Sequence, residues 1–451
     1  MSRTPVFAAI PLLALVAIAV AKRDTPADAA ASSALPPSAA PASWEPSGPE
    51  ARPSSAAIDS LATPAAPGSG EPNLTVGANG RVFMSWLEPS AAGFALRLAT
   101  LDGTRWSAPR TIHQGREFVV NWADFPSVAV MPDGRLVVHW LHRGKGSGAY
   151  SVRVVQSRDD GATWSAPVIL HRDSSETEHG FVSLWAEGTG AGAIANAVWL
   201  DGRKYSPGGS HGAPSGGAAA ASHGAATNEM MVMARGIDAK GTLSAETVVD
   251  PRACDCCQTA AVMTSTGPVV AYRDRSSDEI RDISVVRRVN GKWSAPSPVY
   301  RDGWKIAACP VNGPSMDARG ARVSLAWFTA ANDSARVKLA FSSNGGATWT
   351  APARVDDGNP AGRVGTRLLA DGSALVTWIE RTGGDTASVL ARRISASGAR
   401  GSAVIVASSS AARASGFPRV ATTATHAVFA WTVPGKPTAV RTARMPLSEL
   451  R

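Results

Sequence analysis

Four cysteines are the residues of this chain whose type and spacing most directly suggest chemistry. Three of them, Cys254, Cys256 and Cys257, fall within the segment ACDCCQ, and the fourth, Cys309, follows in AACPVNGP. Grouped thiolates are ligands for soft cations such as Cu(I) and Zn(II). In an oxidising compartment the same residues would instead form two disulfides. The C-x-C-C spacing has one C-x2-C pair, Cys254 and Cys257, and lacks the second pair of an ordinary zinc site, so no cofactor is assigned and both interpretations stay open.

The first 70 residues indicate the compartment. An apolar run follows one early arginine and ends in Ala-Val-Ala at Ala21, which is typical of a cleaved signal peptide over residues 1–21. Residues 22–70 are dominated by Ala, Pro and Ser and predict a disordered tether. We therefore expect a protein that is exported to the periplasm or secreted. Its contact with a membrane would be limited to the N-terminal segment, if that segment stays uncleaved.

The charge of the chain narrows the class of partner. The formal net charge is +9 at pH 7, and the lysines and arginines form no continuous run. A diffuse positive surface favours anionic ligands, whereas nucleic-acid binding requires a basic stripe that the sequence lacks. We expect an anionic small molecule or glycan as partner and no nucleic acid.

A repeat determines the architecture of residues 71–451. Seven segments share an alternating apolar strand, a turn that often contains glycine, and a second strand with an aromatic residue near its end. A period of roughly 50 residues with about four strands predicts an all-β chain folded as a β-propeller. We expect seven blades of four-stranded antiparallel sheets, with six as the alternative, and closure by a strand from the N-terminal side. The seven aromatic residues are Trp86, Trp140, Trp199, Tyr272, Trp327, Trp378 and Trp431.

Two turns between predicted third and fourth strands carry a more specific pattern, SRDDGATW at 157–164 and SSNGGATW at 342–349. The pattern resembles the Asp-box of the sialidase and bacterial neuraminidase repeat superfamily. The resemblance implies a propeller in which these hairpins are structural and face away from the catalytic end. The Asp would bond amides of its own turn, and the Gly would supply a positive φ. The structural positions are Ser157, Asp159, Gly161, Trp164, Ser342, Asn344, Gly346 and Trp349.

The opposite face then contains the candidate ligand site. It is formed by the loops that lead into the innermost strands and by the loops between second and third strands. This topology places the three clustered cysteines at the mouth of the fourth repeat and Cys309 at the mouth of the fifth. The ligand-binding candidates in these loops are Asp124, His179, Arg273, Arg275, Asp278, Asn312, Arg363 and Arg381.

The resemblance to sialidases also implies a catalytic set that the sequence does not show. That mechanism needs three arginines for the substrate carboxylate, a tyrosine nucleophile with a glutamate partner, and an aspartate acid/base. The family's Phe-Arg-Ile-Pro element is absent, because the matching region, EPNLTV, has no arginine. No catalytic residue is assigned. We expect a sialidase-like protein that binds an anionic glycan or other ligand; a diverged sialidase-type hydrolase and a soft-metal-binding or assembly protein are the alternatives.

Overall fold

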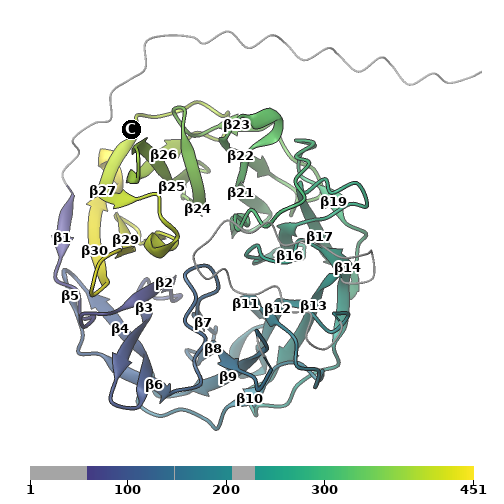
Figure 1. The fold of residues 1–451 in the computed structure, drawn as a ribbon, viewed down its shortest axis with the longest axis vertical. Helices are drawn as coiled ribbons and strands as arrows, with labels where there is room; N and C mark the ends of the chain where they lie inside the picture. Colours follow the sequence, from purple (N-terminus) through teal and green to yellow (C-terminus); the bar gives the residue numbers. More distant parts are fainter. Residues whose placement is uncertain (1–57, 147, 206–228, 451) are drawn as a thin grey trace, which may run out of the picture. The chain divides into compact units, whose positions relative to one another are not determined.

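The computed structural model describes residues 58–146, 148–205 and 229–450. The predicted signal peptide and residues 22–57 of the predicted tether lie outside the described residues. Seven antiparallel sheets are arranged as a ring around a central axis (Figure 1), which confirms the prediction of a seven-bladed propeller. In the part of the chain that is described, no helix has the length and apolar character of a membrane span.

In each of the first four blades the innermost strand comes first in the chain, and the outer strands follow it. The first contains β2 (Gly70–Val76), β3 (Val82–Ser90), β4 (Gly93–Asp102) and β5 (Arg105–Trp106), with β6 (Arg110–Gly115) also paired to β4. The second contains β7 (Ser127–Val130), β8 (Leu136–Arg143), β9 (Tyr150–Ser157) and β10 (Val168–Ile169). The third contains β11 (His179–Glu187), β12 (Ile194–Asp201), β13 (Met230–Ile237) and β14 (Thr247–Ala253). The fourth contains β15 (Ala260–Thr264), β16 (Gly267–Arg273), β17 (Ile283–Val289), β18 (Lys292–Trp293) and β19 (Ser297–Pro298).

Three further blades complete the ring. The fifth contains β20 (Ser315–Arg319), β21 (Arg322–Thr329), β22 (Arg336–Ser342) and β23 (Ala353–Arg354). The sixth contains β24 (Pro360–Leu368), β25 (Ala374–Gly383), β26 (Thr386–Ile394) and β27 (Val404–Ser410). The seventh contains β28 (Arg419–Thr422), β29 (His426–Val433), β30 (Ala439–Pro446) and β1 (Asp59–Leu61). The described helices are short 3₁₀ turns: η1 (Gly190–Gly192), η2 (Ala331–Asp333), η3 (Arg413–Ser415) and η4 (Leu447–Glu449).

The last blade is closed by a strand from the other end of the chain. β1 pairs antiparallel with β30, with Leu61 opposite Thr442, and Leu61 is buried. The expected closure by an N-terminal strand is therefore observed. Both β1 and the start of β2 at Gly70 precede Glu71, the start that the sequence suggested for the propeller. The propeller thus extends further toward the N-terminus than expected.

The aromatic residue of each second strand explains why the repeats pack as blades. The seven aromatic side chains are at most 9% exposed and lie in the cores between neighbouring sheets. Three of the tryptophans also donate Nε1–H to a carboxylate two positions along the same strand. These bonds join Trp86 to Glu88 (2.7 Å), Trp199 to Asp201 (2.8 Å) and Trp378 to Glu380 (2.6 Å). A buried indole N–H needs such a partner, because leaving it unpaired would cost stability.

The turns 157–164 and 342–349 have matching hydrogen bonds. In the first, Oδ1 of Asp159 accepts from the Thr163 amide at 2.8 Å, and Gly161 has a φ of +84°. In the second, Oδ1 of Asn344 accepts from the Thr348 amide at 2.9 Å, and Gly346 has a φ of +77°. The serine hydroxyl of each turn also accepts from the glycine amide, at 2.8 Å and 2.9 Å. Asn can replace Asp because the amide oxygen makes the same bond to the backbone.

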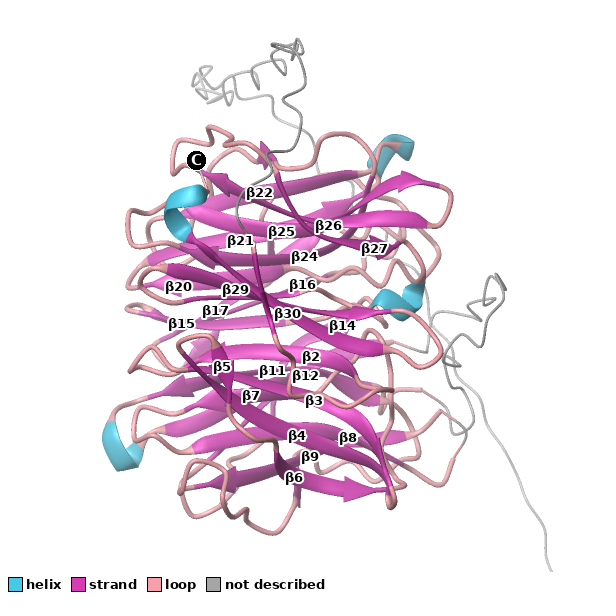
Figure 2. Ribbon diagram, turned by 90° about the vertical axis from the view of Figure 1, so that its left-hand side faces the viewer, coloured by secondary structure: helices cyan, strands magenta, loops and turns pink. Residues whose placement is uncertain are grey.

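Seen from the side, many loops gather at the two faces of the ring (Figure 2).

Candidate functional site

The loops that lead into the innermost strands are tied to one another by hydrogen bonds. The amide of Phe181 donates to Oδ2 of Asp124 at 2.8 Å, joining the third blade to the second. Gln258 joins three loops: its Nε2 donates to the Ala123 carbonyl at 2.6 Å, and its Oε1 accepts from the Gly313 amide at 2.9 Å. The candidate Asp124 is thus buried as part of this ring of ties.

Asn312 and Arg363 continue these ties to the sixth and seventh blades. Oδ1 of Asn312 accepts from the Arg363 amide at 2.7 Å. The Arg363 guanidinium donates to the carbonyls of Ala412 at 2.9 Å and Gly416 at 3.2 Å, and to the Ser415 hydroxyl. Both candidates are buried, so they hold the loops in place and leave direct ligand contact to their neighbours.

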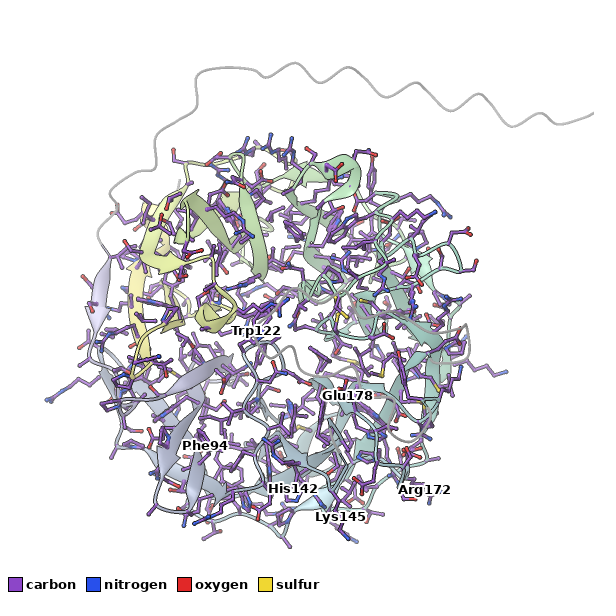
Figure 3. The ribbon with its side chains drawn as sticks, viewed as in Figure 1. Phe94, Trp122, His142, Lys145, Arg172 and Glu178 are labelled. Carbon is purple, nitrogen blue, oxygen red and sulfur yellow. The ribbon has the colours of Figure 1, made fainter. Side chains whose placement is uncertain are left out.

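The loop of residues 119–126 lies across the mouth of the ring. Trp122, which belongs to the second blade's loop, stacks on Phe417 of the seventh blade's loop with ring centroids 6.0 Å apart. Figure 3 shows Trp122 close to the centre of the ring. The sequence predicted that the loops leading into the innermost strands ring the mouth, and this loop also reaches across it to the seventh blade. A cavity of about 670 Å³ lies among the innermost strands and is bordered by Asp124 and Phe125 of the covering loop.

Three arginines form what we call the arginine patch: Arg363 and Arg413, which lie beside the Trp122 ring, and Arg381, whose charge acts on Arg363. The Cζ atoms of Arg363 and Arg413 lie 5.0 Å and 6.0 Å from the Trp122 ring centroid. Burial, followed by the nearby Arg381 and Arg413, lowers the pKa of Arg363 to about 10. Arg381 and Arg413 are exposed, and neither forms an ion pair within the described ranges. Because the positive charges repel one another without a carboxylate partner, this patch favours an anion.

Two acidic side chains form a second group on the same face. Burial raises the pKa of Asp124 to about 7, although hydrogen bonds from Phe181 and Tyr150 act in the opposite direction. Burial, then the charges of Asp124 and Asp255, raises the pKa of Glu178 to about 8. The Tyr150 hydroxyl lies 3.5 Å from Asp124, and its pKa is raised by burial, then by Glu178 and Asp124. Figure 3 shows that Glu178 also lies toward the centre of the ring. Carboxyl groups with pKa values of about 7 and about 8 still carry a proton near neutral pH, which suits them to general acid/base chemistry.

The raised pKa of Asp124 predicts a pH-dependent stability. An acid with a higher pKa in the folded than in the unfolded protein binds more protons when folded, so stability falls as pH rises from about 4 to about 7. The shift to about 7 corresponds to roughly 4 kcal/mol across this range. Replacing Asp124→Asn keeps an acceptor for the Phe181 amide and removes the titration. We expect urea unfolding at pH 4, 5.5 and 7 to show a flatter pH profile for the variant.

Other groups also titrate in this pH range, so the effect of Asp124 is read from the difference between the pH profiles of wild type and Asp124→Asn. Burial lowers the pKa of His139 to about 3 and is the main cause that lowers the pKa of His171 to about 4. These two histidines make stability rise with pH, opposite to Asp124, because each binds fewer protons in the folded than in the unfolded protein. Their contribution cancels in the difference between the two proteins. Identical pH profiles for wild type and Asp124→Asn would show that the carboxyl is not held neutral.

His179 has structural partners. It is buried, and its ring stacks on His171 with centroids 3.8 Å apart. Its Nε2 lies 3.1 Å from Asp173 and 3.6 Å from Asp201, the residue that also accepts from Trp199. These contacts hold the start of β11 against β12 and account for the burial of His179.

The predicted residues of the fourth blade separate into three environments. Arg273 is 1% exposed and donates to the carbonyls of Asn312 and Phe328, both at 2.7 Å. Arg275 is paired with Asp255 at 3.2 Å and with Glu279 at 2.7 Å. Asp278 is exposed in the turn after them. The structure therefore does not bring these three residues together around one ligand.

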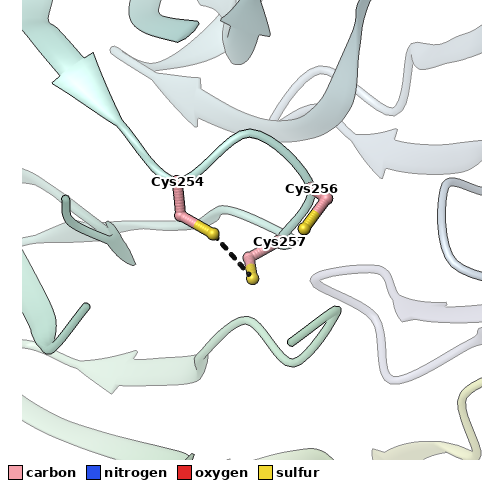
Figure 4. A group of neighbouring side chains, drawn as sticks. All are labelled: Cys254, Cys256 and Cys257. Carbon is pink, nitrogen blue, oxygen red and sulfur yellow. Dashed lines mark hydrogen bonds between the residues drawn. The ribbon is translucent and has the colours of Figure 1, made fainter. Parts of the chain in front are cut away.

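The four cysteines meet as expected from the topology. The Sγ atoms of Cys254, Cys256 and Cys257 all lie within 4.8 Å of one another, on the loop that follows β14 (Figure 4). Cys254 and Cys257 approach to 3.3 Å. The pKa of Cys256 is raised first by burial and then by thiol contacts, of which one is to Cys309. The predicted proximity of Cys309 to the cluster is therefore observed.

Arg281 is a residue of this region that the sequence did not single out. It is 0% exposed, donates to the Cys254 sulfur at 3.3 Å and to Glu279 at 2.8 Å, and lies 3.8 Å from Asp255. Burial would raise the pKa of Cys254, but hydrogen bonds from the two neighbouring thiols and the charge of Arg281 hold it well below its usual value. Asp255, the acidic residue between Cys254 and Cys256 in the sequence, was a signal for a nearby cation such as Arg281.

No family model and no curated protein matches the chain. Similar solved structures include a protein of unknown function from Dyadobacter fermentans, with 13% identity, a TM-score of 0.45, and coverage of 86% of this chain and 94% of that one. An α-L-arabinofuranosidase of Fusarium graminearum has 12% identity, a TM-score of 0.46, and coverage of 85% and 94%. A sialidase of Streptococcus pneumoniae has 11% identity, a TM-score of 0.40, and coverage of 84% of this chain and 68% of that one. These values assign neither a family nor an activity to the chain.

Proposed function

We propose that the protein is exported and binds an anionic glycan, with the arginine patch and Trp122 as the binding surface. The observation that carries the proposal is the approach of Arg363, Arg381 and Arg413 without an ion-pair partner in the described part of the chain. Guanidinium groups donate charge-assisted hydrogen bonds to carboxylates and sulfates. The half-buried Trp122 offers an apolar ring beside them, against which the carbon face of a sugar can pack.

The arrangement assigns different tasks to the three arginines. Arg363 is fully engaged with the loop of Ala412 to Gly416 and supplies positive charge from within the protein. Arg381 and Arg413 have exposed side chains and can reach a ligand. The similarity of the turns at 157–164 and 342–349 to those of sialidases supports a carbohydrate ligand in particular. We propose only a structural role for these turns and no contact with the ligand.

A glycan array tests this function. Purified protein lacking residues 1–21 is applied to immobilised neutral glycans and to their sialylated, uronate-containing and sulfated counterparts. We expect binding to one anionic class and at least about tenfold weaker binding to the matched neutral glycan. Binding should weaken as salt is raised, because exposed charges are screened. Binding to neutral glycans only, or to none, would contradict the proposal.

A second candidate function is hydrolysis of a glycosidic bond. It is favoured by one observation, the pair Asp124 and Glu178 with pKa values of about 7 and 8 beside Tyr150. Both carboxyls can act as proton donors near neutral pH. If the protein is a hydrolase, it releases sugar from the bound glycan, and Glu178→Gln lowers the rate by roughly 10²-fold or more. A wild-type protein that binds a glycan and leaves it intact is a binding protein.

A further inference from the structure

The cysteine cluster is a second site that does not depend on the ligand of the arginine patch. We propose that Cys254, Cys256 and Cys257 bind one Cu(I) ion through their thiolate sulfurs. Each sulfur binds as a thiolate, and a sulfur that is still protonated releases its proton to solvent when it binds. The proposal rests on the distances between the sulfurs, on the buried charges around them and on the number of ligands within reach.

The sulfur positions need only a small adjustment to share one ion. With metal–sulfur bonds of about 2.3 Å, two sulfurs on the same cation lie at most about 4.6 Å apart. The three Sγ atoms already lie within 4.8 Å of one another. Cys254 and Cys257 are each 1% exposed, and the Cys256 side chain packs beside an apolar core. A bound Cu(I) would therefore be shielded from water and oxidants.

The charges around the cluster favour an anionic complex. Arg281 donates directly to the Cys254 sulfur. The Arg273 guanidinium donates to the main-chain carbonyls of Asn312, Arg281 and Phe328. Arg275 shares the carboxylates of Asp255 and Glu279 with Arg281. Two guanidinium groups thus face two carboxylates, and Arg273, which forms no ion pair among the described residues, adds about one buried positive charge that other buried groups must balance. Cu(I) with two or three thiolates carries one or two negative charges.

The number of ligands distinguishes Cu(I) from Zn(II). Structural zinc is almost always four-coordinate, and no fourth ligand atom joins the three sulfurs at the same distance among the described residues. Cys309 is only partly buried and contacts Cys256. Thiolates select soft cations, and Cu(I) accepts the smaller set that the loop offers.

Two disulfides are the competing state of the same residues. The contacts would allow pairs of Cys254 with Cys257 and of Cys256 with Cys309. Disulfides are neutral, however, so the Arg281 guanidinium would face an uncharged sulfur and the excess positive charge would stay unbalanced. The charge argument therefore favours the thiolate complex.

The test is a Cu(I) titration of the reduced full chain under anaerobic conditions, in competition with bicinchoninate. We expect one Cu(I) per chain. Cys254→Ser and Cys257→Ser should each weaken binding by at least about tenfold, whereas the matched control Cys309→Ser should retain the stoichiometry. Cu(I) should also raise the melting temperature of wild type and not that of the Cys254→Ser/Cys257→Ser double variant, which shows whether the variants are folded.

Several results would overturn the proposal. One is a wild-type chain that takes no Cu(I) from the chelator, and another is Cu(I) binding that is equally strong in the double variant. A stoichiometric Zn(II) site that requires Cys309 would replace Cu(I) with a four-coordinate zinc site. Exported protein whose mass is lower by four hydrogens, and which contains no metal, would establish the two disulfides instead. All of these outcomes are independent of glycan binding.

Discussion

Replacing Arg281→Met is expected to lower the free energy of unfolding by about 3–5 kcal/mol, because breaking a buried ion pair leaves charges without a partner. Arg281 is 0% exposed. It forms ion pairs with Glu279 and Asp255 and donates a hydrogen bond to the Cys254 sulfur. Methionine fills similar volume without the charge, so packing is largely preserved. Urea unfolding followed by tryptophan fluorescence measures the difference.

The control is an arginine in an exposed ion pair. Arg81 pairs with Asp160 at 2.9 Å, with side chains 39% and 49% exposed. We expect Arg81→Met to change stability by less than about 1 kcal/mol, because water already screens this pair. Equal effects of the two substitutions would show that the buried charge network around the cysteines contributes nothing particular to the fold.

Replacing Trp378→Ala should lower the free energy of unfolding by about 3–5 kcal/mol, as truncation of large buried aromatic residues does. The ring is 0% exposed and packs between the fifth and sixth blades. Its loss also removes the Nε1–H that donates to Glu380 at 2.6 Å. Thermal and urea unfolding measure the change.

Trp378→Phe separates packing from the hydrogen bond. Phenylalanine keeps much of the ring and removes only the donor, so we expect a smaller loss of about 1–3 kcal/mol from the unsatisfied carboxylate. A loss as large as that of the alanine variant would mean that the bond to Glu380 dominates. No loss in either variant would contradict the role of the second-strand aromatic residues in joining the blades.

The fold could be predicted because its determinants are local and repeated. Alternating apolar residues, glycine turns and an aromatic residue recur in seven segments, from Trp86 to Trp431, and each occurrence supports the same strand assignment. The short β1 strand was harder to locate, because only three residues pair with β30 and they lie in an Ala- and Pro-rich context. Its place depends on ring closure, which no local pattern encodes.

The candidate site was less predictable because it depends on contacts between distant loops. Trp122 belongs to the second blade's loop, yet its position depends on Phe417 and Arg363. Asn312 and Arg363 were predicted in the loops that lead into the innermost strands, but only the structure shows that they tie these loops together. Arg281 belongs to a charged segment that resembles a solvated loop, and its burial follows from the shared carboxylate of Asp255. Sequence spacing alone does not contain these partners.

Glycan binding by arginine variants tests the central claim most directly. Wild type, the Arg381→Ala/Arg413→Ala double variant and the control Arg105→Ala, whose side chain is exposed on β5 of the first blade, are compared on the same glycan array. Because each charge-assisted hydrogen bond contributes about 1.5–3 kcal/mol, we predict at least roughly a hundredfold loss for the double variant and none for Arg105→Ala. Unchanged binding by the double variant, with the melting temperature of wild type, would show that the ligand does not bind at the arginine patch.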